Sequence, residues 1–202
     1  SLDLWPLDSR RFSFHHGTKS FMYPRAVEQY AYHYKMRYPG QEYQTSRELR
    51  LSPLYKILKD KGSVYGSKNG WERPLWFAPK GVEPIDQLDF LNPGWHKYVA
   101  EEHRSVREKV ALIDQTSFGK FELFGKGSLE LLQYLTTCNM DKPIGSVIYS
   151  QLCNEKGGIE ADLTITRLNL EHFYIVTGST FGIHDADWIR QHIPKEKSIF
   201  LI

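Results

Sequence analysis

A Gly-Gly turn lies within the segment Asn154-Glu155-Lys156-Gly157-Gly158-Ile159-Glu160-Ala161-Asp162-Leu163-Thr164-Ile165. Residues 147–153 before it and 162–168 after it are both rich in strand-forming residues, so the segment predicts a tight β-hairpin. Asp162 opens the second strand, which is otherwise apolar and rich in threonine. Its carboxylate can face a pocket and hydrogen-bond a nitrogen heterocycle, or accept a proton from an amine. On turn chemistry alone an aspartate here is more often a turn cap, so both interpretations stay open.

Outward from the hairpin, short helices alternate with short strands. Strands are expected at residues 120–125 and 172–177, and helices at 127–137 and 183–192. A helix over residues 101–112 would carry an apolar stripe of Val106, Val110 and Ile113. Upstream, Pro24 suits the first turn of a helix over residues 24–34, a short helix follows Ser52-Pro53, and residues 66–77 are extended and aromatic. The alternation predicts an α+β fold.

Composition bounds the class of protein. The 202 residues are 41% hydrophobic, 14% aromatic and 25% charged, with a formal net charge of +2, so neither disorder nor nucleic-acid binding is expected. No run of eighteen apolar residues exists, so we expect no membrane span. Two cysteines in a chain of this length fit a reducing compartment. The chain begins without methionine and stops inside an apolar run, so we expect an internal fragment of a longer protein.

Several motifs between residues 95 and 202 agree in order and spacing with one family. They are Glu102-His103, Ser117-Phe118-Gly119-Lys120-Phe121-Glu122, Leu132-Gln133-Tyr134-Leu135-Thr136-Thr137, the hairpin, and Phe173-Tyr174-Ile175-Val176-Thr177-Gly178. This series resembles the folate-binding aminomethyltransferases, the glycine-cleavage T-protein and its relatives.

The first half carries a second set of motifs. They are Leu7-Asp8-Ser9-Arg10-Arg11-Phe12, Tyr38-Pro39, Ser46-Arg47-Glu48-Leu49-Arg50, Ser52-Pro53-Leu54-Tyr55 and Gly70-Trp71-Glu72-Arg73-Pro74-Leu75-Trp76-Phe77. They look like the segment that joins the flavin domain to the folate domain in the dimethylglycine and sarcosine dehydrogenases. The regulatory subunit of pyruvate dehydrogenase phosphatase has this segment too. The chain is identified as a member of this family.

The resemblance implies a domain organisation. Residues 1–22 would be the tail of the flavin-dependent oxidoreductase domain, and residues 23–78 a helical and extended connector domain. Residues 79–94, with Pro79, Gly81, Pro84 and Pro93, would be a linker. Residues 95–202 would be the N-terminal part of a T-protein-like, folate-binding α+β domain.

The resemblance also implies a function. The parent protein would be an FAD-dependent oxidoreductase that acts on the CH–NH bond of dimethylglycine or sarcosine and passes the one-carbon unit to tetrahydrofolate, as in choline degradation. Folate would bind in this region and FAD in a preceding domain, so the fragment alone would be inactive. Its partners would be a small methylated amine, folate and an electron acceptor, with no nucleic acid or membrane. It would be cytoplasmic in a bacterium or in the mitochondrial matrix of a eukaryote.

Two alternatives remain. The parent could be a non-enzymatic regulatory subunit of the phosphatase type, built on the same scaffold. It could also be a stand-alone folate-dependent aminomethyltransferase, although the connector at residues 70–77 argues against this.

For the site itself, the resemblance implies that Asp162 is catalytic and that Phe118, Tyr149, Asp162 and Val176 contact folate. Phe118 and Tyr149 replace aliphatic residues of the T-protein, and Gly178 stands where that protein has a polar amide. No metal site is expected. The pairs His15-His16 and Cys138 with Cys153 lack a ligand spacing, as does the set His184, Asp187 and His192.

Overall fold

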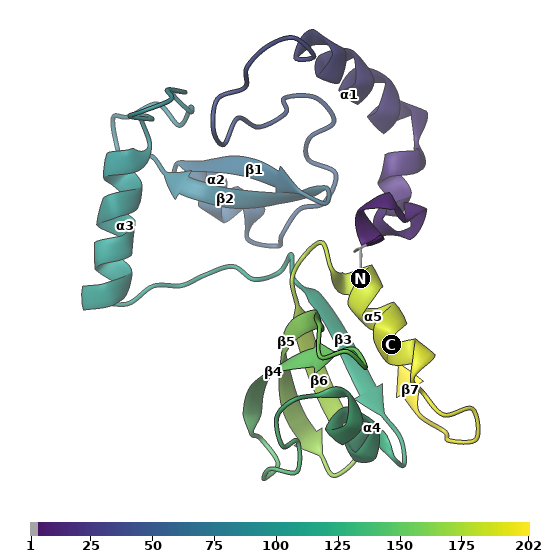
Figure 1. Cartoon of the computed structure of the whole chain (residues 1–202). Helices are drawn as coiled ribbons and strands as arrows, with labels where there is room; N and C mark the ends of the chain where they lie inside the picture. The colour runs from purple at the N-terminus through teal and green to yellow at the C-terminus, as the bar shows by residue number, and fades with distance from the viewer. Residues whose placement is uncertain (1–3) are drawn as a thin grey trace. The chain divides into compact units, whose positions relative to one another are not determined.

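The computed structural model describes residues 4–202 and has a mixed α+β architecture, which confirms the predicted fold class (Figure 1). The chain forms two compact units. The N-terminal unit consists of residues 12–117. The C-terminal unit consists of residues 118–202 together with the described residues up to Arg11.

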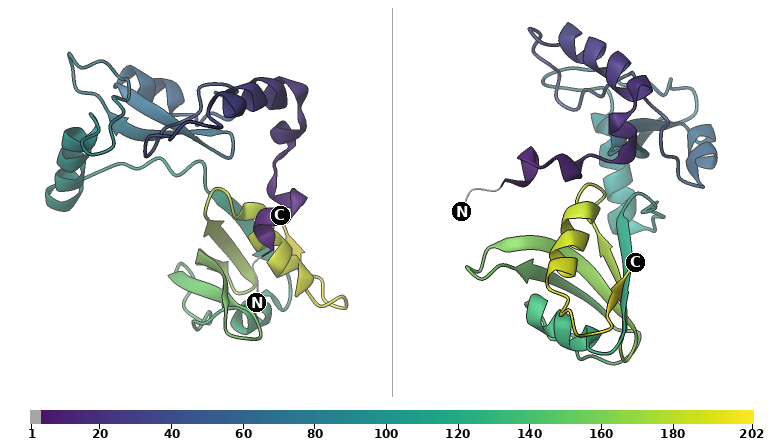
Figure 2. Two further views of the ribbon diagram at one scale, coloured as in Figure 1. Left: turned by 45° about the horizontal axis from the view of Figure 1, so that its top comes forward. Right: turned by 90° about the vertical axis from the view of Figure 1, so that its right-hand side faces the viewer.

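The C-terminal unit is built on a five-stranded antiparallel sheet that twists along its length (Figure 2). The strands are β3 (Gly119–Phe124), β4 (Val147–Cys153), β5 (Ile159–Asn169), β6 (His172–Thr177) and β7 (Phe200–Leu201), in the order β4-β5-β6-β3-β7. The predicted hairpin is confirmed as the β4–β5 pair. Gly157 in its turn has a φ of 76°, a conformation that glycine adopts without steric cost.

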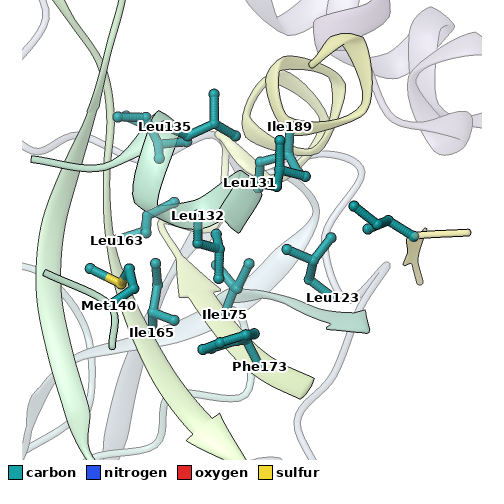
Figure 3. Close-up of a cluster of buried hydrophobic side chains, with 13 residues drawn as sticks. Leu123, Leu131, Leu132, Leu135, Met140, Leu163, Ile165, Phe173, Ile175 and Ile189 are labelled. Atoms are coloured by element: carbon teal, nitrogen blue, oxygen red, sulfur yellow. The ribbon is translucent and has the colours of Figure 1, made fainter. Parts of the chain in front are cut away.

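Two helices cover one face of this sheet. They are α4 (Ser128–Leu135) and α5 (Gly182–Gln191). Leucines of α4 and Ile189 of α5 point toward Leu123, Ile165, Phe173 and Ile175 on the strands (Figure 3). These four strand residues are 0% exposed, and burying each side chain contributes about 1.5–3 kcal/mol. The core therefore lies between the sheet and this helical layer.

The opposite face of the sheet is called the open face here. It carries Tyr149 of β4, Asp162 and Thr164 of β5, and Val176 of β6. Both α-helices of the described part of this unit contribute to the core on the other face. Consequently Tyr149 is 61% exposed and Asp162 is also exposed.

The N-terminal unit centres on a hairpin. Its elements are the 3-10 helix η3 (Phe14–Gly17), the α-helices α1 (Lys19–Ala31), α2 (Tyr55–Asp60) and α3 (His96–Glu108), and the strands β1 (Ser63–Lys68) and β2 (Trp71–Phe77). Asn69 and Gly70 connect β1 to β2 with φ angles of 50° and 79°, as a two-residue hairpin turn requires. Trp76 stacks on Tyr98 of α3 with ring centroids 5.3 Å apart, and this contact ties α3 to the hairpin.

A buried ion pair fastens the preceding loop to this hairpin. Glu72 is 4% exposed, and its Oε1 accepts hydrogen bonds from Arg47 Nε at 2.9 Å and from the backbone N–H of Glu48 at 2.8 Å. Arg47 Nη2 also donates to the carbonyl of Tyr65 at 2.9 Å. A buried carboxylate is stable only when it is paired and hydrogen-bonded in this way.

Two helices differ from the prediction. The first begins at Lys19 because Thr18 accepts a hydrogen bond from the N–H of Phe21, so Pro24 lies inside the helix and does not start it. The third covers His96–Glu108, not residues 101–112. Val110 is 87% and Ile113 67% exposed, so the predicted apolar stripe is not a core face.

Candidate functional site

The register of the sheet brings Tyr149, Asp162 and Val176 onto the open face. Thr164 pairs with Tyr149 on one side and with Val176 on the other, and directly opposite residues share a face. Asp162 lies two residues before Thr164 on β5, and therefore on that same face. Three of the four predicted folate contacts thus occupy adjacent positions on three neighbouring strands.

Phe118, the fourth predicted contact, lies at the end of the same region. Gly119 pairs with Thr177, so Phe118 and Gly178 each stand one residue beyond the paired strands. A Cβ at Gly178 would come within 3.2 Å of the Phe181 ring. A side chain at this position would press on that ring, so the glycine lets Phe181 pack closely against the backbone at this end of β6.

Among residues 4–202, one side chain holds Asp162 by a hydrogen bond. Tyr149 Oη donates to Asp162 Oδ2 at 3.0 Å. The turn itself is capped by Asn154, whose Oδ1 accepts from the N–H groups of Lys156 at 3.0 Å and Gly158 at 2.9 Å. A carboxylate has about four acceptor positions, so Asp162 keeps capacity for further donors.

A buried polar cluster lies where β6 meets α5. Asp185 is 1% exposed and accepts hydrogen bonds from Thr177 Oγ1 and, at 2.9 Å, from His184 Nδ1. Burial raises the pKa of Asp185, and the negative charge of Asp162 acts in the same direction. No sequence signal pointed to this cluster, because an aspartate in the first turn of a helix is usually solvent-exposed and interacts with the helix dipole.

Glu160 joins this cluster through an irregularity in the hairpin. Leu152 pairs with Ala161 and Cys153 with Ile159, so Glu160 is the extra residue of a β-bulge. Its Oε1 accepts from Asn154 Nδ2 at 2.7 Å, and its Oε2 lies 3.8 Å from His184 Nε2. A bulge cannot be read from alternation, so no sequence signal pointed to Glu160.

A cavity of the C-terminal unit is separate from the open face. It has a volume of about 1040 Å³ and lies between residues 4–10, the β4–β5 turn, the end of α4, and α5. Glu160 and His184 line it, whereas Phe118, Tyr149, Asp162 and Val176 do not. The predicted folate contacts therefore form an open surface, and the cavity must be considered on its own chemistry.

Across residues 4–202, no three His, Cys, Asp or Glu side chains are grouped so that they could ligate a metal ion. No helix in that part of the chain combines the length and the hydropathy that crossing a membrane requires. Cys138 and Cys153 are free thiols.

Family comparison gives two adjacent matches. Residues 54–201 match the GCVT N-terminal domain, and residues 1–52 match the FAD dependent oxidoreductase central domain. Over 77% of the chain the fold is similar to 38% of a glycine cleavage system aminomethyltransferase T from Bartonella henselae, with a TM-score of 0.61 and 24% identity.

Curated relatives are similar along most of the chain. A mitochondrial pyruvate dehydrogenase phosphatase regulatory subunit of Mus musculus is 34% identical over 100% of the chain and 24% of its own length. A formaldehyde-forming 4-methylaminobutanoate oxidase of Paenarthrobacter nicotinovorans is 36% identical over 86% of the chain and 21% of its own length. A mitochondrial dimethylglycine dehydrogenase of Rattus norvegicus is 33% identical over 94% of the chain and 22% of its own length. The chain spans about a quarter of the length of these relatives.

Proposed function

The chain belongs to the GCVT N-terminal domain family, and on that premise we propose that it serves a flavin-dependent N-methylglycine dehydrogenase whose open face binds tetrahydrofolate. The observation that carries the proposal is the convergence of the implied folate contacts. Tyr149, Asp162 and Val176 come from three strands and still share one face, and Phe118 stands at its end.

The side chains on the open face fit a reduced pterin chemically. A pterin is a flat heterocycle with N–H donors along one edge, and Asp162 offers a carboxylate acceptor. Tyr149 and Phe118 provide aromatic surfaces on which a flat ring can pack, and Val176 adds an aliphatic one. When bound, tetrahydrofolate supplies a nucleophilic amine that takes up a one-carbon unit.

The roles of the chain's own residues follow from their contacts. The Tyr149 hydroxyl holds Oδ2 of Asp162, which leaves Oδ1 to accept a hydrogen bond from the ligand or to hold a proton. Asp162 is exposed, so residues outside the open face would have to exclude water from the site. The relatives are about four times longer than this chain, so in them further residues are present to cover such a site.

The oxidoreductase assignment rests on the combination of the two family matches. In the proposed whole protein a separate domain binds FAD, oxidises dimethylglycine or sarcosine and passes electrons to an acceptor. The match of residues 1–52 to an oxidoreductase central domain disfavours a stand-alone aminomethyltransferase. The mammalian relatives carry mitochondrial names, which supports the matrix for a eukaryotic protein and the cytoplasm for a bacterial one.

A regulatory subunit is the second candidate function. It is favoured by 34% identity to the phosphatase regulatory subunit along the entire chain. This candidate shares the scaffold but needs no turnover of an amine.

The whole protein distinguishes the two candidates. It should be purified, its flavin spectrum recorded, and dimethylglycine and sarcosine added without oxygen. An oxidoreductase loses its flavin absorbance on adding one of these amines and gains it again with an electron acceptor. A protein that binds no flavin, or whose flavin no methylamine reduces, supports the regulatory subunit instead.

A further inference from the structure

The cavity of the C-terminal unit has walls of aromatic and imidazole rings. Trp5 meets the His184 ring edge-on with centroids 4.8 Å apart, and Trp188 contacts His192 at 4.6 Å. All four rings line the cavity. Ring faces carry partial negative charge and attract cations that lie within about 6 Å.

The charged side chains around the cavity also favour a cation. Four carboxylates and two permanently cationic side chains line it. One of the cations, Arg10, is already paired with Asp8, at 2.7 Å from Nη2, and with Asp187. An anion entering the cavity would therefore be repelled by the excess of negative charge. It would also find the Arg10 guanidinium already paired with two carboxylates.

Glu160 supplies a carboxylate oxygen with free acceptor capacity. Oε1 is occupied by Asn154, whereas Oε2 accepts no hydrogen bond from any residue between 4 and 202. The nearest cationic candidate for Oε2, His184 Nε2, is 3.8 Å away, and the Glu160 side chain is only 24% exposed. A carboxylate on a mostly buried side chain, next to the imidazole that Trp5 contacts, suits a cation that has little need of hydrogen bonds.

From this arrangement we propose that the cavity is a second ligand site, which binds an organic ammonium ion with Glu160 as counter-ion and Trp5 as the aromatic wall. The cavity volume of about 1040 Å³ is at the upper end of the range for ligand sites, so the ammonium group belongs to a larger molecule than a bare head group. The site shares no residue with the open face and does not depend on folate binding.

Choline and its uncharged carbon isostere 3,3-dimethylbutan-1-ol test this inference, because the two have the same shape and differ in charge. Each is titrated into the 202-residue chain while the five indole N–H signals are followed by NMR. Trp5 and Trp188 should shift with choline. Trp71, Trp76 and Trp95 belong to the N-terminal unit and serve as internal controls. The isostere should bind at least about tenfold more weakly, the effect of losing one desolvated cation–π and ionic contact.

Two variants and a control complete the experiment. Glu160→Gln keeps the shape and the hydrogen bond to Asn154 but removes the charge, and Trp5→Leu keeps apolar volume but removes the ring. Each should weaken choline binding about tenfold, whereas Glu196→Gln, an exposed carboxylate outside the cavity, should not. Amide spectra of all three variants establish that they fold. The inference is overturned if choline causes no saturable shift, if the isostere binds equally well, or if folded Glu160→Gln binds choline as the wild type does.

Discussion

Tyr149 Oη donates a 3.0 Å hydrogen bond to Asp162 Oδ2 across the β4–β5 pair, so the two side chains act together on the open face. Both are exposed, and a hydrogen bond in this setting contributes about 0.5–1.5 kcal/mol. Its main consequence is orientation, because it fixes which carboxylate oxygen is left for a ligand.

Asp162→Asn in the whole protein should separate flavin reduction from folate chemistry. The substitution keeps the shape of the side chain but removes the charge and the ability to hold a proton. The mutant should reduce its flavin with amine at a near-normal rate, while its rate of methylenetetrahydrofolate formation falls about 10²-fold and free formaldehyde rises. The measurement is the ratio of the two products.

Asp60→Asn is the matched control, since Asp60 is an exposed aspartate at the end of α2 in the N-terminal unit. An unchanged product ratio in Asp162→Asn would remove Asp162 from the site. A loss of about 1 kcal/mol in stability with no change in products would point to a purely structural role.

Tyr149→Phe should weaken folate binding by less than Tyr149→Ala. The phenylalanine keeps the ring for stacking and loses only the hydroxyl that orients Asp162, so we expect a change of about 3- to 10-fold. The alanine loses the ring as well and should cost about a further tenfold. Binding of a stable reduced folate, measured by calorimetry on the whole protein, gives both values. Equal affinities for the two variants would show that the ring does not contact the ligand.

Asp185→Asn should change how stability depends on pH. The pKa of Asp185 is raised above its ordinary 3.8 in the folded state, so the native protein binds a proton that the unfolded chain releases. Wild-type stability should therefore fall, relative to the variant, as the pH rises from 3.8 through the folded-state pKa. Urea unfolding, followed by amide signals of β6, measures the difference at each pH. The prediction is wrong if the wild type instead becomes more stable relative to the variant as the pH rises over that range.

Limited proteolysis should cut first between residues 78 and 93. This segment contains no helix or strand, and Leu91 within it is 95% exposed. Chymotrypsin should cleave beside Phe90 and Leu91, and replacing both with serine should delay the first cut. Mass spectrometry of the earliest products identifies the site. A first cut within the β4–β5 hairpin would count against the predicted linker at residues 79–94. A first cut beside Leu112, in the connection between α3 and β3, would do the same.

The predictable parts of the fold are those whose signal is local. The β6 strand was predicted with its observed ends, because His172–Thr177 alternates and is bounded by turns. The β1–β2 hairpin was missed although Asn69-Gly70 is a strong hairpin signal, because the aromatic residues around it read as one extended segment. The end of α3 was misplaced because Val110 and Ile113 fit a helical stripe, whereas tertiary contacts favour Tyr98 and its neighbours.

The candidate site also has parts that the sequence predicts and parts that it does not. A repeat of two residues along a strand fixes which face a side chain occupies, so the grouping of Tyr149, Asp162 and Val176 follows once the pairing register is known. The burial of Asp185 and the orientation of Glu160 depend on a helix position and a bulge, which no pattern in a single sequence specifies.

The buried pair of Arg47 and Glu72 has a consequence for how such proteins can be recombined. The two family matches meet at residues 52–54, and the pair has one member in each. A polypeptide divided at that junction would leave the Glu72 carboxylate buried without its cation, at a cost of about 3–5 kcal/mol. The pair therefore couples the stability of the two matched stretches across this junction. A chimera that exchanges partners there should fold only when positions 47 and 72 are taken from the same parent.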